Sequence, residues 1–414
     1  MRIGRTLPPA AAPLSWRDLA SGLQGWVRGR RETQRFAGEL QARFNRRHCF
    51  LVSSGKAALT LILLALKEAR PKRDQVLIPA FTCYSVPSAI VRAGLQVSLC
   101  DIDPSTLDFD ARQLREKLAD PRLLCVVPVH LFGLPADVGR LKAMINDPEV
   151  AIVEDAAQAM GGEHLGRKLG TLGDVGFFSL GRGKALSTVE GGVILTDRDD
   201  LGGAIAGKFA KLEEYRCPQN LVLFLYALAL WVLTRPALFW LPKAMPFLRL
   251  GETTFDPEFP LRKLAGLQAG LARNWQLKLA AMQIIRRTAV QDWQASLPSP
   301  FLPAGEATPP PLLRFPLVLA TAEDARAVVG EGARQGLGIA LSYPDAVHRV
   351  PALAARFTGQ DFPVATDAAR RMVTLPVHGY VRPKDRRKIL KLFHSKLSAF
   401  PKGQNVEVKV SRVG

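Results

Sequence analysis

Short apolar runs alternate with amphipathic stretches along the first half of the chain. The apolar runs are nearly continuous, which is typical of strands buried on both faces of a parallel sheet. The stretches between them are long enough for the helices that connect parallel strands. We therefore expect an α/β fold with a largely parallel central sheet. Strands are predicted at 50–52, 75–79, 97–101, 123–128, 150–153, 174–179 and 192–196, and helices at 16–44, 57–69, 85–93, 110–118 and 137–145.

The second half of the chain has a different pattern, with a long helix predicted over 263–295 and a proline-rich linker over 298–311. With 414 residues the chain is longer than one core usually requires. We predict a large α/β domain (1–210), an apolar insertion (211–255), and a segment with the long helix and a small α+β domain (256–414). In that last segment a strand is predicted at 312–319, a helix at 322–335 and a terminal helix from about 383.

The insertion contains an uncharged apolar stretch, residues 221–234, followed by a second apolar and aromatic piece at 237–241. A bilayer-spanning helix needs about 20 apolar residues, so this stretch is too short to cross comfortably. Its aromatic residues and flanking cations fit a segment that dips into one leaflet of a membrane. The alternative is a helical hairpin packed at an oligomer interface, and both interpretations stay open.

Charge and cysteine content indicate the cellular compartment of the protein and the classes of partner that it can bind. The five cysteines are scattered, odd in number and without a CxxC motif, which indicates reduced thiols in a cytoplasm and neither a disulfide framework nor a zinc site. No apolar stretch long enough for a signal peptide follows the N-terminal Met-Arg-Ile-Gly-Arg. The net charge of +19 suits a polyanionic small substrate or the anionic inner face of a membrane. The basic residues are spread along the chain and no nucleic-acid-binding motif is present, so no nucleic-acid partner is expected.

Asp155 and Lys184 are the candidate chemical groups, since each follows the end of an apolar strand. The carboxyl ends of parallel strands share one edge of a sheet, where α/β proteins hold their ligands. An acid and a lysine that meet there suit pyridoxal 5'-phosphate (PLP), because the lysine amine can form a Schiff base with it and the acid can keep its ring nitrogen protonated. An ordinary surface ion pair is the alternative.

A phosphate site is the second candidate. The Ser54-Gly55-Lys56 run follows a short strand and opens an apolar helix. Free N–H groups at a helix start bind anions, so this turn suits the phosphate of a cofactor. Plain helix capping by Ser54 needs no ligand and explains the same residues.

With these residues in place, the chain resembles the DegT/DnrJ/StrS family of sugar aminotransferases from about residue 51 to 392. That resemblance implies the fold of type I PLP-dependent transferases, with a mostly parallel central sheet, flanking helices and a smaller α+β C-terminal domain. The motifs that carry it are SSGKAAL (53–59), PAFT (79–82), DIDP (101–104), PVHLFG (128–133), EDAAQ (154–158), GDVG (173–176), 184–192, FPVA (362–365) and LPVH (375–378).

The resemblance also assigns roles to individual residues. Lys184 would form the Schiff base and then move protons, and Asp155 would pair with the pyridine nitrogen. Gln158 would hydrogen-bond the phenolic oxygen of the cofactor. Ser179, with Ser54 and the backbone of Gly55 and Lys56, would hold the phosphate. His130 is either a substrate-lining residue or a packed structural histidine.

Three positions depart from the family pattern. Cys83 stands where relatives have an aromatic residue that stacks on the cofactor, so the stacking partner is either the neighbouring Tyr84 or absent. Lys56 replaces a common threonine. The Asn-Tyr-Arg element that reaches the phosphate of a partner subunit corresponds to 259–263, which lacks the asparagine, so Arg262 or Lys263 would substitute for it.

The leading hypothesis is a PLP-dependent aminotransferase of the cytoplasm that acts as a homodimer. It would move an amino group from an amino acid, with glutamate as the expected donor, to a keto sugar carried on a nucleotide diphosphate. One alternative is a PLP-dependent sugar dehydratase of the same family. That branch has histidine in place of the lysine, whereas this chain keeps Lys184. A membrane-attached, non-catalytic binding or regulatory homologue is the other alternative.

Overall fold

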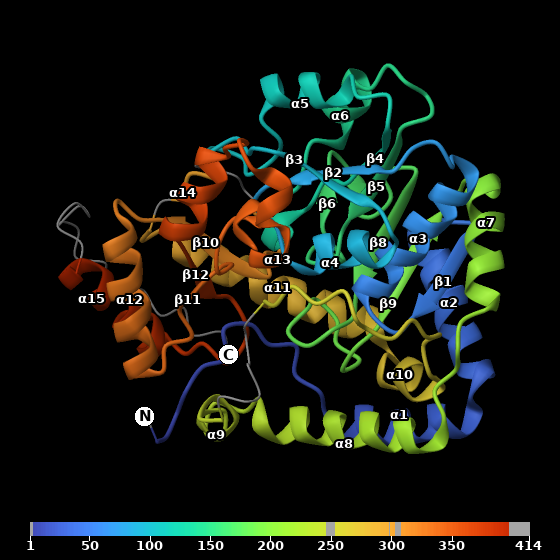
Figure 1. Ribbon diagram of the computed structural model, residues 1–414. Helices are drawn as coiled ribbons and strands as arrows, with labels where there is room; N and C mark the ends of the chain where they lie inside the picture. Colours follow the sequence, from blue (N-terminus) through green and yellow to red (C-terminus); the bar gives the residue numbers. More distant parts are fainter. Residues whose placement is uncertain (1–2, 246–252, 298, 303–307, 397–414) are drawn as a thin grey trace.

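A seven-stranded sheet forms the centre of the computed structural model, which describes residues 3–245, 253–297, 299–302 and 308–396 (Figure 1). The strand order is β1-β9-β8-β5-β4-β2-β3. The predicted, largely parallel sheet is confirmed, with the exception of β9, which is antiparallel to both of its neighbours. The strands are β1 (His48–Val52), β2 (Gln75–Pro79), β3 (Gln96–Cys100), β4 (Leu123–Val126), β5 (Ala151–Asp155), β8 (Val175–Ser179) and β9 (Gly192–Thr196).

Helices cover the sheet, and most of them lie where the hydrophobic pattern predicts them. One predicted element was wrong: the helix expected over 16–44 is two helices, because Gly29 interrupts it with φ of 53°. A left-handed φ is easy for glycine and incompatible with a continuing helix. The helices of this part are α1 (Trp16–Arg28), α2 (Arg30–Phe44), α3 (Gly55–Ala69), α4 (Ser85–Arg92), α5 (Ala111–Leu118), α6 (Val138–Met144) and α7 (Asp199–Ala210).

The long helix predicted over 263–295 was also wrong as a single element. It consists of α10 (Gly266–Leu271) and α11 (Trp275–Gln294), separated by Asn274 with φ of 55°. Asparagine tolerates the left-handed conformation better than most residues. A short β6–β7 hairpin (Glu163–His164, Arg167–Lys168) and the 3₁₀ turn η1 (Leu131–Gly133) were not predicted.

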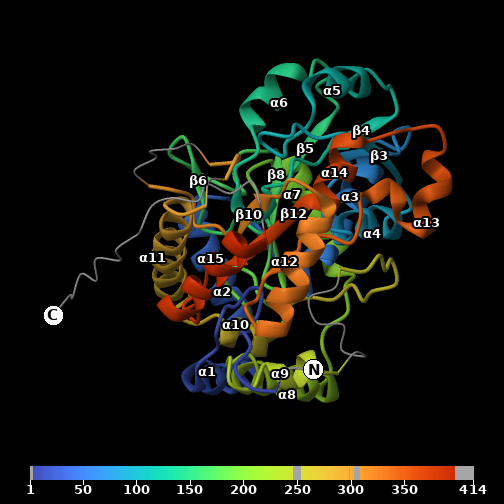
Figure 2. The same cartoon turned by 90° about the vertical axis from the view of Figure 1, so that its left-hand side faces the viewer.

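The C-terminal part carries a three-stranded antiparallel sheet of order β10-β12-β11. The predicted strand at 312–319 and the helices at 322–335 and beyond 383 are confirmed, while the rest of this part was not predicted. Its elements are β10 (Arg314–Val318), α12 (Ala322–Gln335), β11 (Ala340–Leu341), η3 (Val347–Arg349), α13 (Pro351–Ala354), η4 (Ala355–Phe357), α14 (Pro363–Arg371), β12 (Met372–Pro376) and α15 (Pro383–Lys396). Figure 1 shows this sheet and α12 to the left of the large sheet, and in Figure 2 they face the viewer.

One hydrophobic cluster runs through both sheets, from Val52 in β1 to Phe393 in α15. The boundaries predicted at 210 and 255 remain predictions. Residues 303–307 of the proline-rich linker and 246–252 of the insertion lie outside the described residues.

The apolar insertion forms α8 (Cys217–Leu233) and the short helix α9 (Trp240–Lys243), which lie with α1 along the base of the molecule (Figures 1 and 2). On the inner side of this layer, α1 and α10 approach backbone to backbone: a Cβ built on Gly25 would clash with the Gly266 carbonyl oxygen. Within the described ranges, no helix is both long and apolar enough to cross a bilayer.

The N-terminal segment crosses from the insertion to the small sheet. Leu7 N–H donates to the Gly336 carbonyl at 2.8 Å, and Thr6 N–H donates to the Pro236 carbonyl at 2.7 Å. His378 is buried, and its Nε2 lies 2.8 Å from the Pro8 carbonyl while its Nδ1 lies 3.3 Å from the Tyr380 amide. A neutral ring with the proton on Nε2 satisfies both contacts. Burial lowers the pKa of His378 to about 4, and the charges of Arg286 and Arg314 act in the same direction.

This histidine predicts a dependence of stability on pH. Between pH 6.5 and about 4 the unfolded chain binds more protons at position 378 than the folded chain does, so the free energy of unfolding falls as the pH falls. The loss from this group is at most about 3 kcal/mol. In urea unfolding at pH 7 and pH 5, His378→Gln should show a smaller loss than the wild type. His394→Gln, at an exposed position, is the control and should lose as much stability as the wild type does. If His378→Gln also loses as much as the wild type between pH 7 and pH 5, the assignment is contradicted.

Candidate functional site

The site is built at the carboxyl edge of the large sheet, where β5 and β8 end side by side. Asp155 is the last residue of β5, and Lys184 lies in the loop that joins β8 to β9. That loop is closed by backbone hydrogen bonds, from Leu180 N–H to the Gly191 carbonyl at 2.8 Å and from Thr188 N–H to the Leu180 carbonyl at 2.9 Å. The structure therefore brings the predicted acid and the predicted lysine to the same edge.

Asp155 is a buried carboxylate with little local compensation. Its Oδ1 accepts a hydrogen bond from Ala157 N–H at 2.9 Å, the single hydrogen bond that its carboxylate accepts within the described part of the chain. Burial raises the pKa of Asp155, while the Ala157 N–H and the Lys184 ammonium act in the opposite direction. A cation placed against the carboxylate would stabilise its ionised form.

Lys184 is half-buried, and its side chain forms no hydrogen bond or ion pair with any residue that the structure describes. Its backbone, in contrast, is fixed. The Arg286 guanidinium reaches from α11 and donates from Nη2 to the Lys184 carbonyl oxygen at 3.3 Å. The amine is thus left free to react at a position that the main chain holds in place.

The start of α3 lies against the end of β8. Ser54 caps the helix, its Oγ accepting from Ala57 N–H at 3.0 Å. A Cβ built on Gly55 would lie 3.0 Å from the Ser179 Cβ, and one built on Gly192 would lie 2.3 Å from the Ser54 carbonyl oxygen. Gly55 and Ser179 are therefore neighbours, as a phosphate cradle requires, and the first N–H groups of α3 lack partners inside the helix.

The Lys56 side chain turns away from this cradle. Its Nζ lies 3.2 Å from Asp256 Oδ2 and 4.3 Å from the centre of the Phe259 ring. Of the groups that Lys56 offers, only the backbone N–H remains in the first turn of α3.

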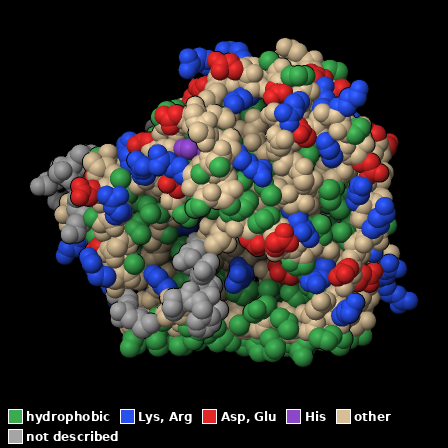
Figure 3. Space-filling model, viewed as in Figure 1, with side chains coloured by type: hydrophobic (Ala, Val, Ile, Leu, Met, Phe, Trp, Pro, Cys, Tyr) green, Lys and Arg blue, Asp and Glu red, His purple; other side chains and the backbone are tan. Residues whose placement is uncertain are grey.

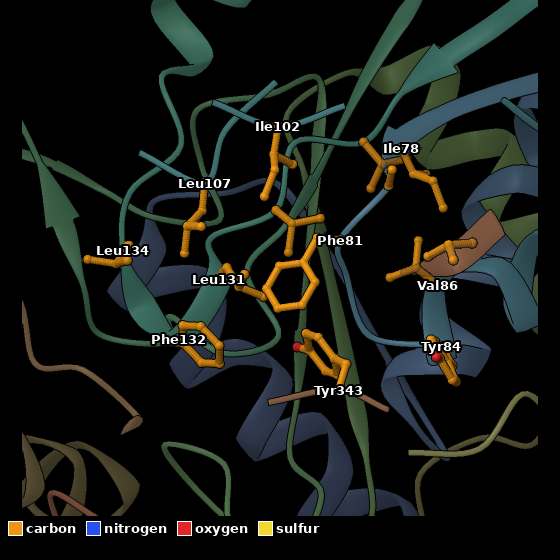
Figure 4. Packing of buried hydrophobic residues seen from close by; sticks show 14 of the residues in the cluster. Ile78, Phe81, Tyr84, Val86, Ile102, Leu107, Leu131, Phe132, Leu134 and Tyr343 are labelled. Carbon is orange, nitrogen blue, oxygen red and sulfur yellow. The ribbon is translucent and has the colours of Figure 1, made fainter. Parts of the chain in front are cut away.

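Gln158 contacts an aromatic residue that sequence reasoning missed. Its Nε2 donates to Tyr343 Oη at 3.0 Å. The Tyr343 ring stands edge-on to Phe81 at 5.3 Å and parallel to Phe132 at 6.5 Å between ring centres. Figure 4 shows Tyr343 beside these two rings and Tyr84 some way from them. Tyr343 lies far from Gln158 in sequence and follows β11, so no local pattern pointed to it.

Tyr84, the predicted stacking residue, is held elsewhere. Its hydroxyl donates to the Asp345 carbonyl at 2.8 Å and accepts from the Asp345 N–H at 2.9 Å. Burial raises the pKa of Tyr84 to about 12. Tyr84 therefore ties α4 to the segment after β11.

His130 occupies the packed core, with both ring nitrogens engaged. Its Nδ1 accepts from Ala136 N–H at 2.9 Å, so Nε2 carries the proton and donates to Glu154 Oε1 at 2.7 Å. The side chain is 0% exposed. This arrangement agrees with the structural interpretation of His130 and leaves neither nitrogen for a substrate.

Glu154 accepts three further hydrogen bonds, from the N–H groups of Gly170, Leu172 and Gly173 at 2.6, 2.5 and 2.9 Å. Burial opposes its ionisation, yet the contacts with His130, Gly173 and Gly170 outweigh burial and hold the pKa of Glu154 below that of an ordinary glutamate. The Glu154–His130 pair therefore fixes the turn at 170–173, next to the strand that ends at Asp155.

Arg262 and Lys263 lie at a different place. They face Glu213 and Glu214 at 3.7 and 3.5 Å, and Lys263 lines a cavity of about 640 Å³ between α2, the start of α8 and the start of α10. Neither Asp155 nor Lys184 lines this cavity. Their backbone is nevertheless held beside the predicted phosphate turn, because Ser53 N–H donates to the Arg262 carbonyl at 2.8 Å and Arg262 N–H donates to Ser53 Oγ at 3.3 Å. Within one subunit, only the side chains of the two cations point to a different place.

Arg314 is the second residue that the sequence did not reveal. It begins β10, and its Nε and Nη2 are buried without a hydrogen-bond partner among the described residues. Burial lowers its pKa to about 10, and the nearby Tyr343 opposes this. Buried unpaired guanidinium groups are costly, which makes Arg314 a candidate to bind an anion.

The model of the DegT/DnrJ/EryC1/StrS aminotransferase family matches residues 18–211 and 263–394. The chain belongs to this family. Because the match spans most of the chain, the resemblance inferred from the motifs is confirmed, and the segment left between the two matched parts contains α8 and α9.

Curated relatives of the family are similar over shorter stretches. An L-glutamine:2-deoxy-scyllo-inosose aminotransferase of Streptoalloteichus tenebrarius is 37% identical over 168 residues, 41% of this chain and 39% of that protein. A GDP-perosamine synthase of Caulobacter vibrioides is 35% identical over 155 residues, 37% of this chain and 41% of that protein. The alignments thus span about two fifths of these relatives.

Solved structures of the family share the whole fold. Helicobacter pylori PseC, an aminotransferase involved in the biosynthesis of pseudoaminic acid, superposes with a TM-score of 0.75 at 14% identity, covering 96% of this chain and 100% of that one. The sugar aminotransferase CalS13 of Micromonospora echinospora gives 0.72 at 21% identity, covering 94% and 99%. The predicted type I transferase fold is confirmed.

The Glu154 contacts predict a large loss of stability on substitution. Glu154→Gln removes the charge that His130 and three backbone N–H groups stabilise, so the free energy of unfolding should fall by about 3–5 kcal/mol. The exposed Glu163→Gln should change it by less than about 0.5 kcal/mol. Urea unfolding of both variants measures this, and equal effects would show that the buried contacts are unimportant.

Proposed function

We propose that this chain is a PLP-dependent aminotransferase that transfers an amino group from an amino acid to a keto sugar carried on a nucleotide diphosphate. The observation that carries the proposal is the meeting of Asp155 and Lys184 at one sheet edge in a chain of this aminotransferase family. The names of relatives that act on an inosose or a GDP sugar support the sugar class of the acceptor.

The residues at this edge fit PLP. Three groups correspond to the aldehyde, the ring nitrogen and the phosphate of that cofactor. They are a lysine amine without a partner among the described residues, a buried carboxylate with spare acceptor capacity, and a helix start beside a serine. When bound, PLP supplies a ring that withdraws electrons from the carbon bearing the transferred amine. We propose that Ser54, Gly55, the Lys56 N–H and Ser179 bind the phosphate, and that Gln158 binds the phenolic oxygen.

Asp155 and Lys184 would have different roles in proton binding and proton transfer. Asp155 would hold a proton on the ring nitrogen, and the positive charge so created would in turn keep its buried carboxylate ionised. Lys184 Nζ would take a proton from one carbon and deliver it to the next, as a general base and then a general acid. Arg286 positions this amine through the Lys184 carbonyl.

Tyr343 is proposed to flank the cofactor ring, the role that the sequence assigned to Tyr84. Its hydroxyl contacts Gln158. Burial raises the pKa of Tyr343 and the charge of Asp155 acts in the same direction, so Tyr343 lies close to both predicted cofactor contacts. Phe81 and Phe132 support its ring from two directions.

Arg314 is proposed to bind the carboxylate of the amino-acid donor. Its guanidinium is near Tyr343 and has two buried nitrogens without a partner in the described ranges. A planar carboxylate fits an arginine well because two parallel hydrogen bonds form. Glutamate is the proposed donor.

A homodimer and a cytoplasmic location belong to the same proposal. Arg262 and Lys263, whose side chains face Glu213 and Glu214 in their own subunit, would reach the phosphate of a partner subunit. All five cysteines are free thiols, as a reducing compartment allows.

Replacement of Lys184 tests the function. Lys184→Ala should lower the rate of 2-oxoglutarate release from glutamate by at least about 10²–10⁴-fold, because the proton-transferring group is lost. The exposed Lys142→Ala is the control and should match the wild type. Borohydride reduction of the PLP-loaded wild type should attach the cofactor to the peptide containing Lys184, as measured by mass spectrometry. Transamination by Lys184→Ala, or a label on another lysine, would end the proposal.

Replacement of Arg314 tests donor recognition separately. Arg314→Met should raise KM for glutamate by about 10–100-fold, the loss of a hydrogen bond to a charged group, and leave PLP absorbance unchanged. Arg314→Lys should recover part of the affinity because it keeps the charge. Arg326→Met, an exposed substitution on α12, is the control. An unchanged KM in Arg314→Met would show that the carboxylate binds elsewhere.

A further inference from the structure

The base of the molecule is an exposed apolar face made by α1 and α8. The large apolar side chains that α8 exposes are Leu221, Val222, Leu225, Tyr226 and Leu228, and those of α1 are Trp16, Leu23 and Val27. Figure 3 shows hydrophobic side chains gathered along this base. We call these eight residues the basal face. Apolar patches of this extent on a protein surface mark a site of interaction.

The basal face is held rigidly from behind. Leu223 and Ala227 point inward from α8 and pack with Leu19 of α1 and with Leu267 and Leu271 of α10. The outward side chains recur on one side of each helix, for example at 16, 23 and 27 in α1. Figures 1 and 2 both place the two helices along the same edge of the molecule. The exposed residues therefore form one surface.

Cations border the basal face, and α8 itself contains no charged residue. Arg17, Arg216, Arg235 and Lys243 are exposed and form no ion pair with any acidic residue that the structure describes. Asp18, the acidic residue at the start of α1, is buried and paired with Lys278. An apolar surface with an unneutralised basic rim matches the acyl boundary and the phosphate layer of an anionic membrane.

A second copy of the chain matches this surface less well. An isologous contact would place the same patch on both partners, so the rim cations of one copy would approach those of the other. Like charges at a rim oppose association, whereas lipid phosphates neutralise them. In addition, α8 and α9 lie in the segment that the family model does not match, so the five basal-face residues of α8 are an addition to the framework that the family shares, whereas Leu23 and Val27 of α1 lie within the matched part.

We propose that the basal face binds the surface of an anionic membrane, with α8 and α1 lying in the plane of the interface. This inference does not depend on the proposed enzymatic activity, since none of the eight residues belongs to the Asp155 edge. Contact with one leaflet requires no spanning helix, in agreement with the length of α8.

Vesicle sedimentation tests the proposal with the full chain. The wild type should pellet with vesicles of phosphatidylglycerol and phosphatidylcholine, bind less to phosphatidylcholine alone, and lose affinity as salt is raised, because exposed charges are screened. The triple variant Leu221→Ser, Leu225→Ser, Tyr226→Ser should reduce the bound fraction at least tenfold.

Two controls separate membrane binding from other effects. Leu165→Ser with Ile284→Ser removes exposed apolar residues of the β6–β7 turn and of α11, neither of which belongs to the basal face, and should bind as the wild type does. Circular dichroism establishes that each variant is folded. The proposal can fail without any variant, because it requires the wild type itself to bind. If the wild type stays in the supernatant with anionic vesicles, the proposal is overturned. A wild-type oligomer that the triple variant dissociates, without vesicle binding, overturns it in favour of a second copy.

Discussion

The buried Glu154 carboxylate, both of whose oxygens accept hydrogen bonds, holds the carboxyl edge of the large sheet together. Glu154 joins the end of β5 to His130 after β4 and to the three backbone N–H groups of the turn before β8. Its neighbour Asp155 is buried with one hydrogen bond only, among the residues described. The two adjacent residues therefore differ in hydrogen bonding. Glu154 uses both carboxylate oxygens in structural contacts, whereas Asp155 can still accept hydrogen bonds from a ligand.

That contrast arises from the pleat of the strand, which directs consecutive side chains to opposite faces of the sheet. Glu154 points to the side where backbone donors are concentrated, and Asp155 points to the side of Lys184 and Tyr343. The proposed chemistry needs both. A carboxylate that binds a cationic ring must be ionised at the edge of a low-dielectric region, and it remains in place because the strand beneath it is fixed by its neighbour.

The central strands and most helices were predictable because continuous apolar runs and capping residues are local signals. Asp155 and Lys184 could be paired from sequence because strand ends share an edge. The helix breaks at Gly29 and Asn274 were missed because one left-handed residue interrupts an otherwise unbroken helical pattern. Tyr343 and Arg314 were missed for a different reason: they come from the small sheet, and only tertiary packing brings them to Gln158 and its surroundings. The direction of Lys56 likewise depends on Asp256, two hundred positions away.

The reversed strand β9 has a consequence for how new specificity could arise in this protein. Because β9 pairs antiparallel with β8, the loop that bears Lys184 connects two adjacent strands. Backbone hydrogen bonds among Leu180, Thr188 and Gly191 close this loop where it leaves the sheet. These contacts at both ends of the loop fix the position of Lys184 relative to β8 and β9. Diversification is easier in the segments that arrive from outside, the β10 and β11 ends with Arg314 and Tyr343. The Lys184 amine can therefore keep its position while the residues proposed to recognise the substrates change around it.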